Sequence, residues 1–153
     1  MKIIIAGAGD VGFHLAKLLS YEAQDTYVVD FDGEKLEYLN NHLDVITKKG
    51  DATSIKLLKE IGVNSADLLL AVTESPNTNF TISVIGKALG VKKTIARISN
   101  PEFLNNPCIN FKDYGVDFMI SPEELAAEEI KSLLNQSSFN DTVAFENGVF
   151  NIM

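Results

Sequence analysis

Short apolar runs alternate along the chain with longer stretches in which apolar residues recur at helical spacing. The apolar runs have the length of β-strands and end at polar or turn-forming residues. The predicted strands are Lys2–Ala6, Tyr27–Asp30, Val45–Lys48, Leu68–Val72, Thr94–Arg97 and Asp117–Ile120. Because the runs are nearly continuous rather than alternating, they are typical of strands that are buried on both faces of a parallel sheet.

The stretches between these runs carry the apolar stripes of helices that pack on a sheet. The predicted stripes are Val11, Leu15, Leu18 and Leu19; Ile55, Leu58 and Ile61; and Phe80, Val84, Ile85, Ala88 and Leu89. Ser121 and Pro122, with Glu124 three residues after the serine, predict the start of a last helix. Gly62 and Gly90 are expected to end two of the earlier helices.

Strand–helix alternation repeated about six times predicts an α/β fold. We expect a Rossmann-like, doubly wound, six-stranded parallel sheet of order 3-2-1-4-5-6, with helices on both faces. This nucleotide-binding domain is expected to cover residues 1–136. Residues 137–153 differ, since alternating apolar residues around Asn147-Gly148 predict a hairpin. We interpret this tail as the start of a truncated C-terminal unit or as an interface hairpin.

The charge and composition of the chain argue against several classes of function. The chain has 153 residues, 13 basic and 21 acidic side chains and a net charge of −8, which disfavours nucleic acid and anionic membranes as direct partners. No apolar run approaches the roughly 20 residues of a membrane span, and no signal peptide is evident, so we expect a cytoplasmic protein. Cys108 is the only cysteine, and His14 and His42 lie too far apart for a zinc pair.

The segment "IAGAGDVG" places three glycines directly after the first predicted strand. The spacing Gly7-x-Gly9-x-x-Gly12 is typical of a turn that exposes backbone N–H groups at a helix N-terminus, where a pyrophosphate binds. The motif alone is weak, since a tight turn also needs glycine, but the strand before it and the helix after it favour phosphate binding. The predicted phosphate-binding residues are Gly7, Ala8, Gly9, Asp10, Val11 and Gly12.

Two acidic residues follow the second and third predicted strands. Asp30 lies close to the expected distance of about 20 residues from the glycines, where a carboxylate binds the ribose hydroxyls of NAD and repels a 2′-phosphate. The alternative for Asp30 and Asp32 is a turn and a helix cap, and we assign Asp32 to the cap. Asp51 in "GDAT" is expected to accept from the adenine amine or to cap the next helix, and the two roles are compatible with each other. The predicted site also includes Phe31 and Ala52.

Polar residues follow the fourth and fifth predicted strands, across the point where the strand order reverses. Ligands bind there in open α/β sheets. Thr73 and Asn79 are therefore expected to face the ligand crevice. Arg97 is the only arginine of the chain, and it is expected to hold a phosphate or a neighbouring subunit's carboxylate. The alternative for Arg97 is a surface ion pair, which is worth only about 0–1 kcal/mol.

Several segments together resemble one family. The segments "MKIIIAGAGDVG", "VVDFDGEKL", "GDAT", "AVTESPNTN", "IARISNPEF" and "DFMISPEELAAEEI" are similar to the N-terminal nucleotide-binding domain of Trk-type potassium-uptake regulators, the KTN or RCK domains. The resemblance covers residues 1 to about 136 and implies a cytosolic domain that binds NAD(H) or ATP, ADP or AMP. It also implies a homo-oligomer, a dimer or a ring, on the inner face of a potassium-translocating membrane subunit, where ligand binding gates ion flux.

The resemblance also assigns the predicted residues to parts of the ligand. The three glycines would hold the phosphates, Asp30 the ribose and Asp51 the adenine, and Thr73, Asn79 and Arg97 would complete the pocket. The chain departs from many relatives at Pro76-Asn77, where an acidic residue is common, and at Ser99, where a second arginine is common. The missing arginine weakens the expected grip on a triphosphate.

Two other functions are compatible with a glycine-rich Rossmann-like domain. An NAD-dependent oxidoreductase fragment would need an acid or base near the nicotinamide, and no tyrosine of this chain has a lysine four residues on. A scaffold with a vestigial site would bind no nucleotide. We therefore expect a regulatory domain that is not an enzyme, with NAD(H) or an adenine nucleotide as its ligand and NADP disfavoured.

Overall fold

The computed structural model describes residues 1–22, 24–104 and 106–140 of the chain. The chain divides into two compact units, Met1–Ser121 and Pro122–Met153. The predicted boundary at residue 136 falls within the last helix, which runs as far as Asn140. The predicted hairpin around Asn147-Gly148 lies outside the described residues.

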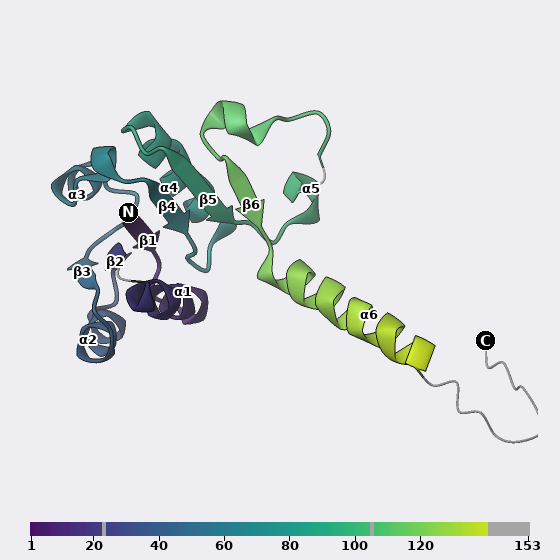
Figure 1. Ribbon diagram of the computed structural model, residues 1–153. Helices are drawn as coiled ribbons and strands as arrows, with labels where there is room; N and C mark the ends of the chain where they lie inside the picture. The colour runs from purple at the N-terminus through teal and green to yellow at the C-terminus, as the bar shows by residue number, and fades with distance from the viewer. Residues whose placement is uncertain (23, 105, 141–153) are drawn as a thin grey trace, which may run out of the picture. The chain divides into compact units, whose positions relative to one another are not determined.

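The first unit is built from alternating strands and helices (Figure 1). Its strands are β1 (Lys2–Ala6), β2 (Asp25–Asp30), β3 (Ile46–Lys49), β4 (Leu68–Ala71), β5 (Lys93–Arg97) and β6 (Phe118–Ile120). Its helices are α1 (Asp10–Tyr21), α2 (Gly33–His42), α3 (Ile55–Glu60), α4 (Pro76–Ala88) and α5 (Pro101–Leu104), with 3-10 turns η1 (Val63–Ser65) and η2 (Phe111–Tyr114). The described part of the second unit is helix α6 (Pro122–Asn140), which begins at the predicted proline.

The six strands form one parallel sheet of order β3-β2-β1-β4-β5-β6, which confirms the predicted fold. The predicted limits of β1 are those observed, and the limits of the other five strands differ by one or two residues. The largest difference is in β2, which begins two residues earlier than predicted, at Asp25. Strand β3 is shifted by one residue because its sequence, ITKK, lies at the sheet edge and carries little apolar signal.

Both faces of the sheet are buried, as the continuous apolar runs predict. In β1, Ile3 and Ile5 pack with residues of α1 and α2, whereas Ile4 and Ala6 pack with residues of α3, η1 and α4. All four of these side chains are fully buried. The strand therefore supplies one core layer on each side, which is the two-sided arrangement of a doubly wound fold.

The helix stripes are only partly as predicted, because small residues occupy the centre of the helix–sheet contacts. Helix α1 buries Gly12 and Ala16 most deeply, while Leu18 is 63% exposed, so its place in the predicted stripe is wrong. Ile55 in α3 is likewise exposed at 52%. A small side chain at the contact lets the helix approach the sheet closely, and larger apolar residues then flank the contact.

Helix α4 shows the same effect more strongly. Its fully buried residues are Asn79, Ile82, Ser83 and Gly86, which follow the 3.6-residue period but include only one large apolar side chain. The predicted residues Phe80, Val84, Ile85 and Leu89 are partly buried and flank this contact, and Ala88 is exposed. Gly62 and Gly90 follow the ends of α3 and α4 with φ of 71° and 108°, which confirms that both glycines terminate helices.

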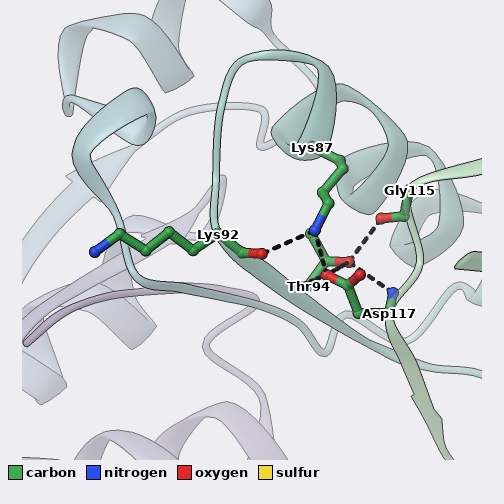
Figure 2. Close-up of polar contacts among 5 residues, drawn as sticks. All are labelled: Lys87, Lys92, Thr94, Gly115 and Asp117. Atoms are coloured by element: carbon green, nitrogen blue, oxygen red, sulfur yellow. Dashed lines mark hydrogen bonds and ion pairs between the residues drawn. The ribbon is translucent and has the colours of Figure 1, made fainter.

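A polar cluster ties α4 and β5 to the segment before β6 (Figure 2). The Asp117 carboxylate lies 2.7 Å from the Lys87 ammonium and accepts a 2.9 Å hydrogen bond from the Thr94 backbone N–H. The Thr94 hydroxyl donates to the Gly115 carbonyl at 2.6 Å, and the Lys87 ammonium also donates to the Lys92 carbonyl at 2.8 Å. These bonds fix the entry of the chain into the short strand β6.

Candidate functional site

A cavity of about 730 Å³ opens at the carboxyl ends of the strands. It lies where β1 and β4 are neighbours and the strand order reverses, which is the usual ligand position in an open α/β sheet. The lining residues come from the loops after β1, β2, β3 and β4, from α1, α2 and α4, and from the ends of β2 and β5. They include the predicted residues Gly7, Gly9, Asp10, Val11, Asp30, Phe31, Asp51, Ala52, Thr73 and Arg97.

Two of the three motif glycines allow close packing of the protein with itself. Gly7 has a φ of +112°, and a Cβ there would lie 2.9 Å from the Thr73 backbone nitrogen. A Cβ on Gly12 would lie only 1.9 Å from the Gly7 carbonyl oxygen. The loop after β1 therefore folds tightly under the start of α1, as the motif predicts, and Gly12 does not itself line the cavity.

Gly9 differs from the other two, because its missing side chain faces open space. A Cβ added there would meet nothing within 4 Å, yet Gly9 lines the cavity and is the N-cap residue of α1. Its φ of −72° is open to any residue, so the backbone conformation does not require glycine. The observed space is what a ligand phosphate needs to approach the backbone N–H groups of a helix N-terminus.

Asp30 holds this loop in place from the end of β2. Its carboxylate accepts a 2.6 Å hydrogen bond from the Ala8 N–H and a 2.8 Å hydrogen bond from the Asp32 N–H. The side chain is buried, with 9% of the residue exposed, and it lines the cavity. Each carboxylate oxygen has more than one acceptor site, so Asp30 can orient the glycine loop and still accept from a ribose hydroxyl. Asp32 caps α2 as predicted, accepting from Glu34 and Lys35.

Asp51 lies at the β3 side of the cavity and does not cap α3. Its carboxylate accepts from both the backbone N–H and the hydroxyl of Thr53, at 2.8 and 2.7 Å, and these bonds lower the pKa of Asp51. The cap of α3 is Ser54, whose hydroxyl accepts from Leu57. The capping alternative for Asp51 is therefore wrong, while its exposed carboxylate remains at the cavity wall.

Asn79 lies behind the cavity rather than in it. The side chain is fully buried. Its amide oxygen accepts from the Thr73 N–H and hydroxyl, at 2.8 and 2.6 Å, and its amide nitrogen donates to the carbonyls of Thr73 and Arg97, at 2.9 and 2.8 Å. These four bonds use the hydrogen-bonding capacity of the amide. Asn79 therefore positions the ends of β4 and β5, and Thr73 and Arg97 reach the cavity in its place.

Several residues of the cavity wall are not among those predicted from the sequence. They are Val29, Asp32, Lys35, Gly50, Val72, Glu74, Ser75 and Thr78. Ser75 is the N-cap of α4, where its hydroxyl accepts from the Thr78 N–H at 3.2 Å. The signal Ser75-Pro76 marks a helix start after a strand, and in this fold such a start lies at the carboxyl edge of the sheet.

A smaller cavity of about 460 Å³ adjoins the first on the side of α1 and α2. The residues that line both cavities are Gly9, Asp10, Lys35 and Glu74. Ala8, which the sequence places in the phosphate loop, lines only the smaller one. The described residues contain no group of acidic, histidine or cysteine side chains suited to a metal ion, and none of their helices is long and apolar enough to cross a membrane.

The sheet order, the glycine loop and the carboxylate at the end of β2 define a Rossmann-like domain of the nucleotide-binding class. The TrkA-N domain family matches residues 3–122, and the chain belongs to this family. A Trk system potassium uptake protein TrkA homolog from Archaeoglobus fulgidus is 34% identical over 148 residues, which are 97% of this chain and 34% of that protein. The chain thus spans about a third of this curated relative.

Solved structures share the fold at lower sequence identity. The TrkA-N domain of the inner membrane protein ybaL from Escherichia coli superposes with a TM-score of 0.76 at 17% identity, over 87% of this chain and 96% of that chain. The GsuK channel bound to NAD gives a TM-score of 0.66 at 18% identity, over 79% of this chain and 21% of that chain. At these identities the likeness supports the fold alone.

Proposed function

We propose that this domain binds NAD(H) or an adenine nucleotide at the cavity above Gly9 and regulates potassium transport without catalysing a reaction. The observation that carries the proposal is the open space over Gly9, beside a loop whose other two glycines are packed tightly. Asp30 adds a carboxylate where a ribose would lie. The potassium-uptake relative and the channel solved with NAD favour the same function.

Each part of the site has a role in this proposal. The glycine loop and the α1 N-terminus hold the phosphates, Asp30 accepts from the ribose hydroxyls, and Asp51 accepts from the adenine amine. Thr73 and Arg97 extend the site toward the end of β5. The full-length protein would form a dimer or ring at the cytoplasmic face of a potassium-translocating membrane subunit. Nucleotide binding would then shift that assembly between two states that differ in affinity.

The decisive experiment is calorimetric titration with NAD⁺, NADH, ADP and ATP of the wild-type chain and of a Gly9→Ala variant. The added methyl group meets no protein atom, and alanine is a poorer N-cap residue than glycine, so the free energy of unfolding should fall by about 1 kcal/mol. Nucleotide affinity should fall at least tenfold, since the methyl group occupies the space of the phosphates.

Gly33→Ala is the matched control. Gly33 also begins a helix of the fold, lies outside both cavities, and its added methyl group would meet only the flexible end of Lys49. Binding should survive this change. Wild-type protein that binds none of the four nucleotides would refute the proposal and favour a scaffold. Steady oxidation of NADH with a panel of ketones would favour the oxidoreductase alternative instead.

A further inference from the structure

The larger cavity is lined by more acidic than basic side chains. Its cationic lining residues are Lys35 and Arg97. Its carboxylates are Asp10, Asp30, Asp32, Asp51 and Glu74. A site for an anionic ligand usually contains several cationic side chains. The excess of carboxylates here should therefore limit which anionic ligands can bind.

Three of the carboxylates already have donors from the loops that carry them. Asp30 accepts from the N–H groups of Ala8 and Asp32, Asp32 accepts from the first turn of α2, and Asp51 accepts from Thr53. Charge-assisted hydrogen bonds from N–H and O–H donors stabilise a carboxylate and hold it in position. These three side chains are therefore fixed in the walls of the cavity.

Asp10 and Glu74 are different. Within the described part of the chain, neither carboxylate forms a hydrogen bond or an ion pair. Both line the larger and the smaller cavity together with Gly9, so they flank the boundary between the two. A phosphate bound over Gly9 would therefore lie in a region that two acidic residues line, and Lys35 is the one basic residue that lines both described cavities.

We propose that Asp10 and Glu74 make this site selective against nucleoside triphosphates, so that its ligand is a dinucleotide or a nucleotide with no more than two phosphates. The inference rests on the proposed function and names the ligand class of the same site. At neutral pH, NAD⁺ carries two phosphodiester charges that its nicotinamide partly offsets, whereas ADP and ATP carry about three and four negative charges. Each additional phosphate charge meets the same pair of carboxylates.

The size of the effect follows from Coulomb's law. Two unit charges about 4 Å apart interact by about 1 kcal/mol even in bulk water, which corresponds to roughly a fivefold change in affinity, and the interaction is stronger in a partly closed cavity. Two carboxylates acting on one additional phosphate charge should therefore weaken ATP relative to ADP by at least fivefold. Salt screens this difference.

The test measures the ratio of the dissociation constants of ATP and ADP by calorimetry on the whole chain, in EDTA at low salt, with NAD⁺ titrated alongside. Wild-type protein should bind ADP at least fivefold more tightly than ATP, and NAD⁺ at least as tightly as ADP. Glu74→Gln should lower the ATP-to-ADP ratio by at least threefold, and Asp10→Asn should act in the same direction. Glu37→Gln removes one exposed α2 carboxylate outside both cavities and should leave the ratio unchanged.

The outcomes separate this inference from the proposed function. Failure of every nucleotide to bind wild-type protein would overturn both. Tight ADP and NAD⁺ binding with an equal or better affinity for ATP would overturn only the selectivity. A ratio that Glu37→Gln lowers as much as Glu74→Gln would show that net charge, rather than these two carboxylates, sets the preference, and would also overturn it.

Discussion

Removal of the Asp117 side chain tests whether the polar cluster before β6 stabilises the first unit. Asp117→Ala deletes the acceptor of the Lys87 ammonium at 2.7 Å and of the Thr94 N–H at 2.9 Å. The two side chains of the ion pair are only 33% and 20% exposed for Lys87 and Asp117, so water replaces these bonds incompletely. The Lys87 ammonium and the Thr94 N–H would then be partly buried without the carboxylate that they bind.

The expected loss is larger than that of a surface ion pair. A hydrogen bond to a charged group contributes about 1.5–3 kcal/mol to stability. Because the pair is partly exposed to water, we expect Asp117→Ala to lower the free energy of unfolding by roughly 2–3 kcal/mol and not by the sum of its bonds. For a unit of this size we expect the melting temperature to fall by about 10 °C. The control is Glu60→Ala, which breaks the more exposed Lys48–Glu60 pair at 3.5 Å and should cost less than about 1 kcal/mol.

The pH dependence gives an independent check. Partial burial raises the pKa of Asp117, but the Lys87 ammonium and the Thr94 donors outweigh it and bring the pKa below the ordinary value of an aspartate. A lowered folded-state pKa adds stability that is fully present above the unfolded pKa and is lost as the pH falls through the folded pKa. Urea unfolding at pH 7, 5 and 3 should therefore show a gap between wild type and Asp117→Asn that is constant from pH 7 to 5 and narrows by pH 3. A loss for Asp117→Ala no larger than for Glu60→Ala, or a gap that does not narrow, would show that the Asp117 carboxylate does not stabilise this unit.

Three further changes test the packing around the site. Gly12→Ala places a methyl group 1.9 Å from the Gly7 carbonyl, and circular dichroism should show a protein destabilised by more than about 3 kcal/mol. Asn79→Ala removes four hydrogen bonds in the core and should cost roughly 3 kcal/mol in urea unfolding while also weakening nucleotide binding in calorimetry. Ser83→Ala removes a buried hydroxyl that has no partner in the described residues, so unfolding should show a stability equal to or above that of wild type.

The fold follows from the sequence because periodicity and strand burial are local signals. The apolar runs of β1 and β4 are complete strands in the structure, and the sheet order follows from six strand–helix repeats. Periodicity does not show which residue of a helix lies at the centre of its contact with the sheet. Gly12 is buried because α1 approaches the Gly7 carbonyl too closely for a larger side chain, while Leu18 is exposed. Gly7 in turn packs against Thr73 after β4, a contact between distant segments that periodicity does not show.

In the candidate site, too, short motifs can be recognised in the sequence, whereas contacts between distant segments cannot. The glycine spacing and Asp30 are visible in the sequence because the motif is short and its partners follow at known distances. The role of Asn79 is not visible, since its partners are the carbonyls of Thr73 and Arg97 on two strands. The sequence also does not decide which residue caps α3, because Asp51 and Ser54 both precede the helix. The hydrogen bonds show that the cap is Ser54.

The bonding of the cavity wall also constrains how the proposed regulation can work. A ligand shifts an equilibrium only if the two states bind it differently. Asp30, Asn79 and the glycine loop are held by buried hydrogen bonds and tight backbone contacts before any ligand arrives, so they offer the same contacts in any state that keeps this unit folded. Under the proposed regulation, a difference in affinity between two states would then depend on groups at the rim that make no such bonds. Asp10 and Glu74 are such groups among the described residues, so a charge brought near them in one state would change nucleotide affinity in that state.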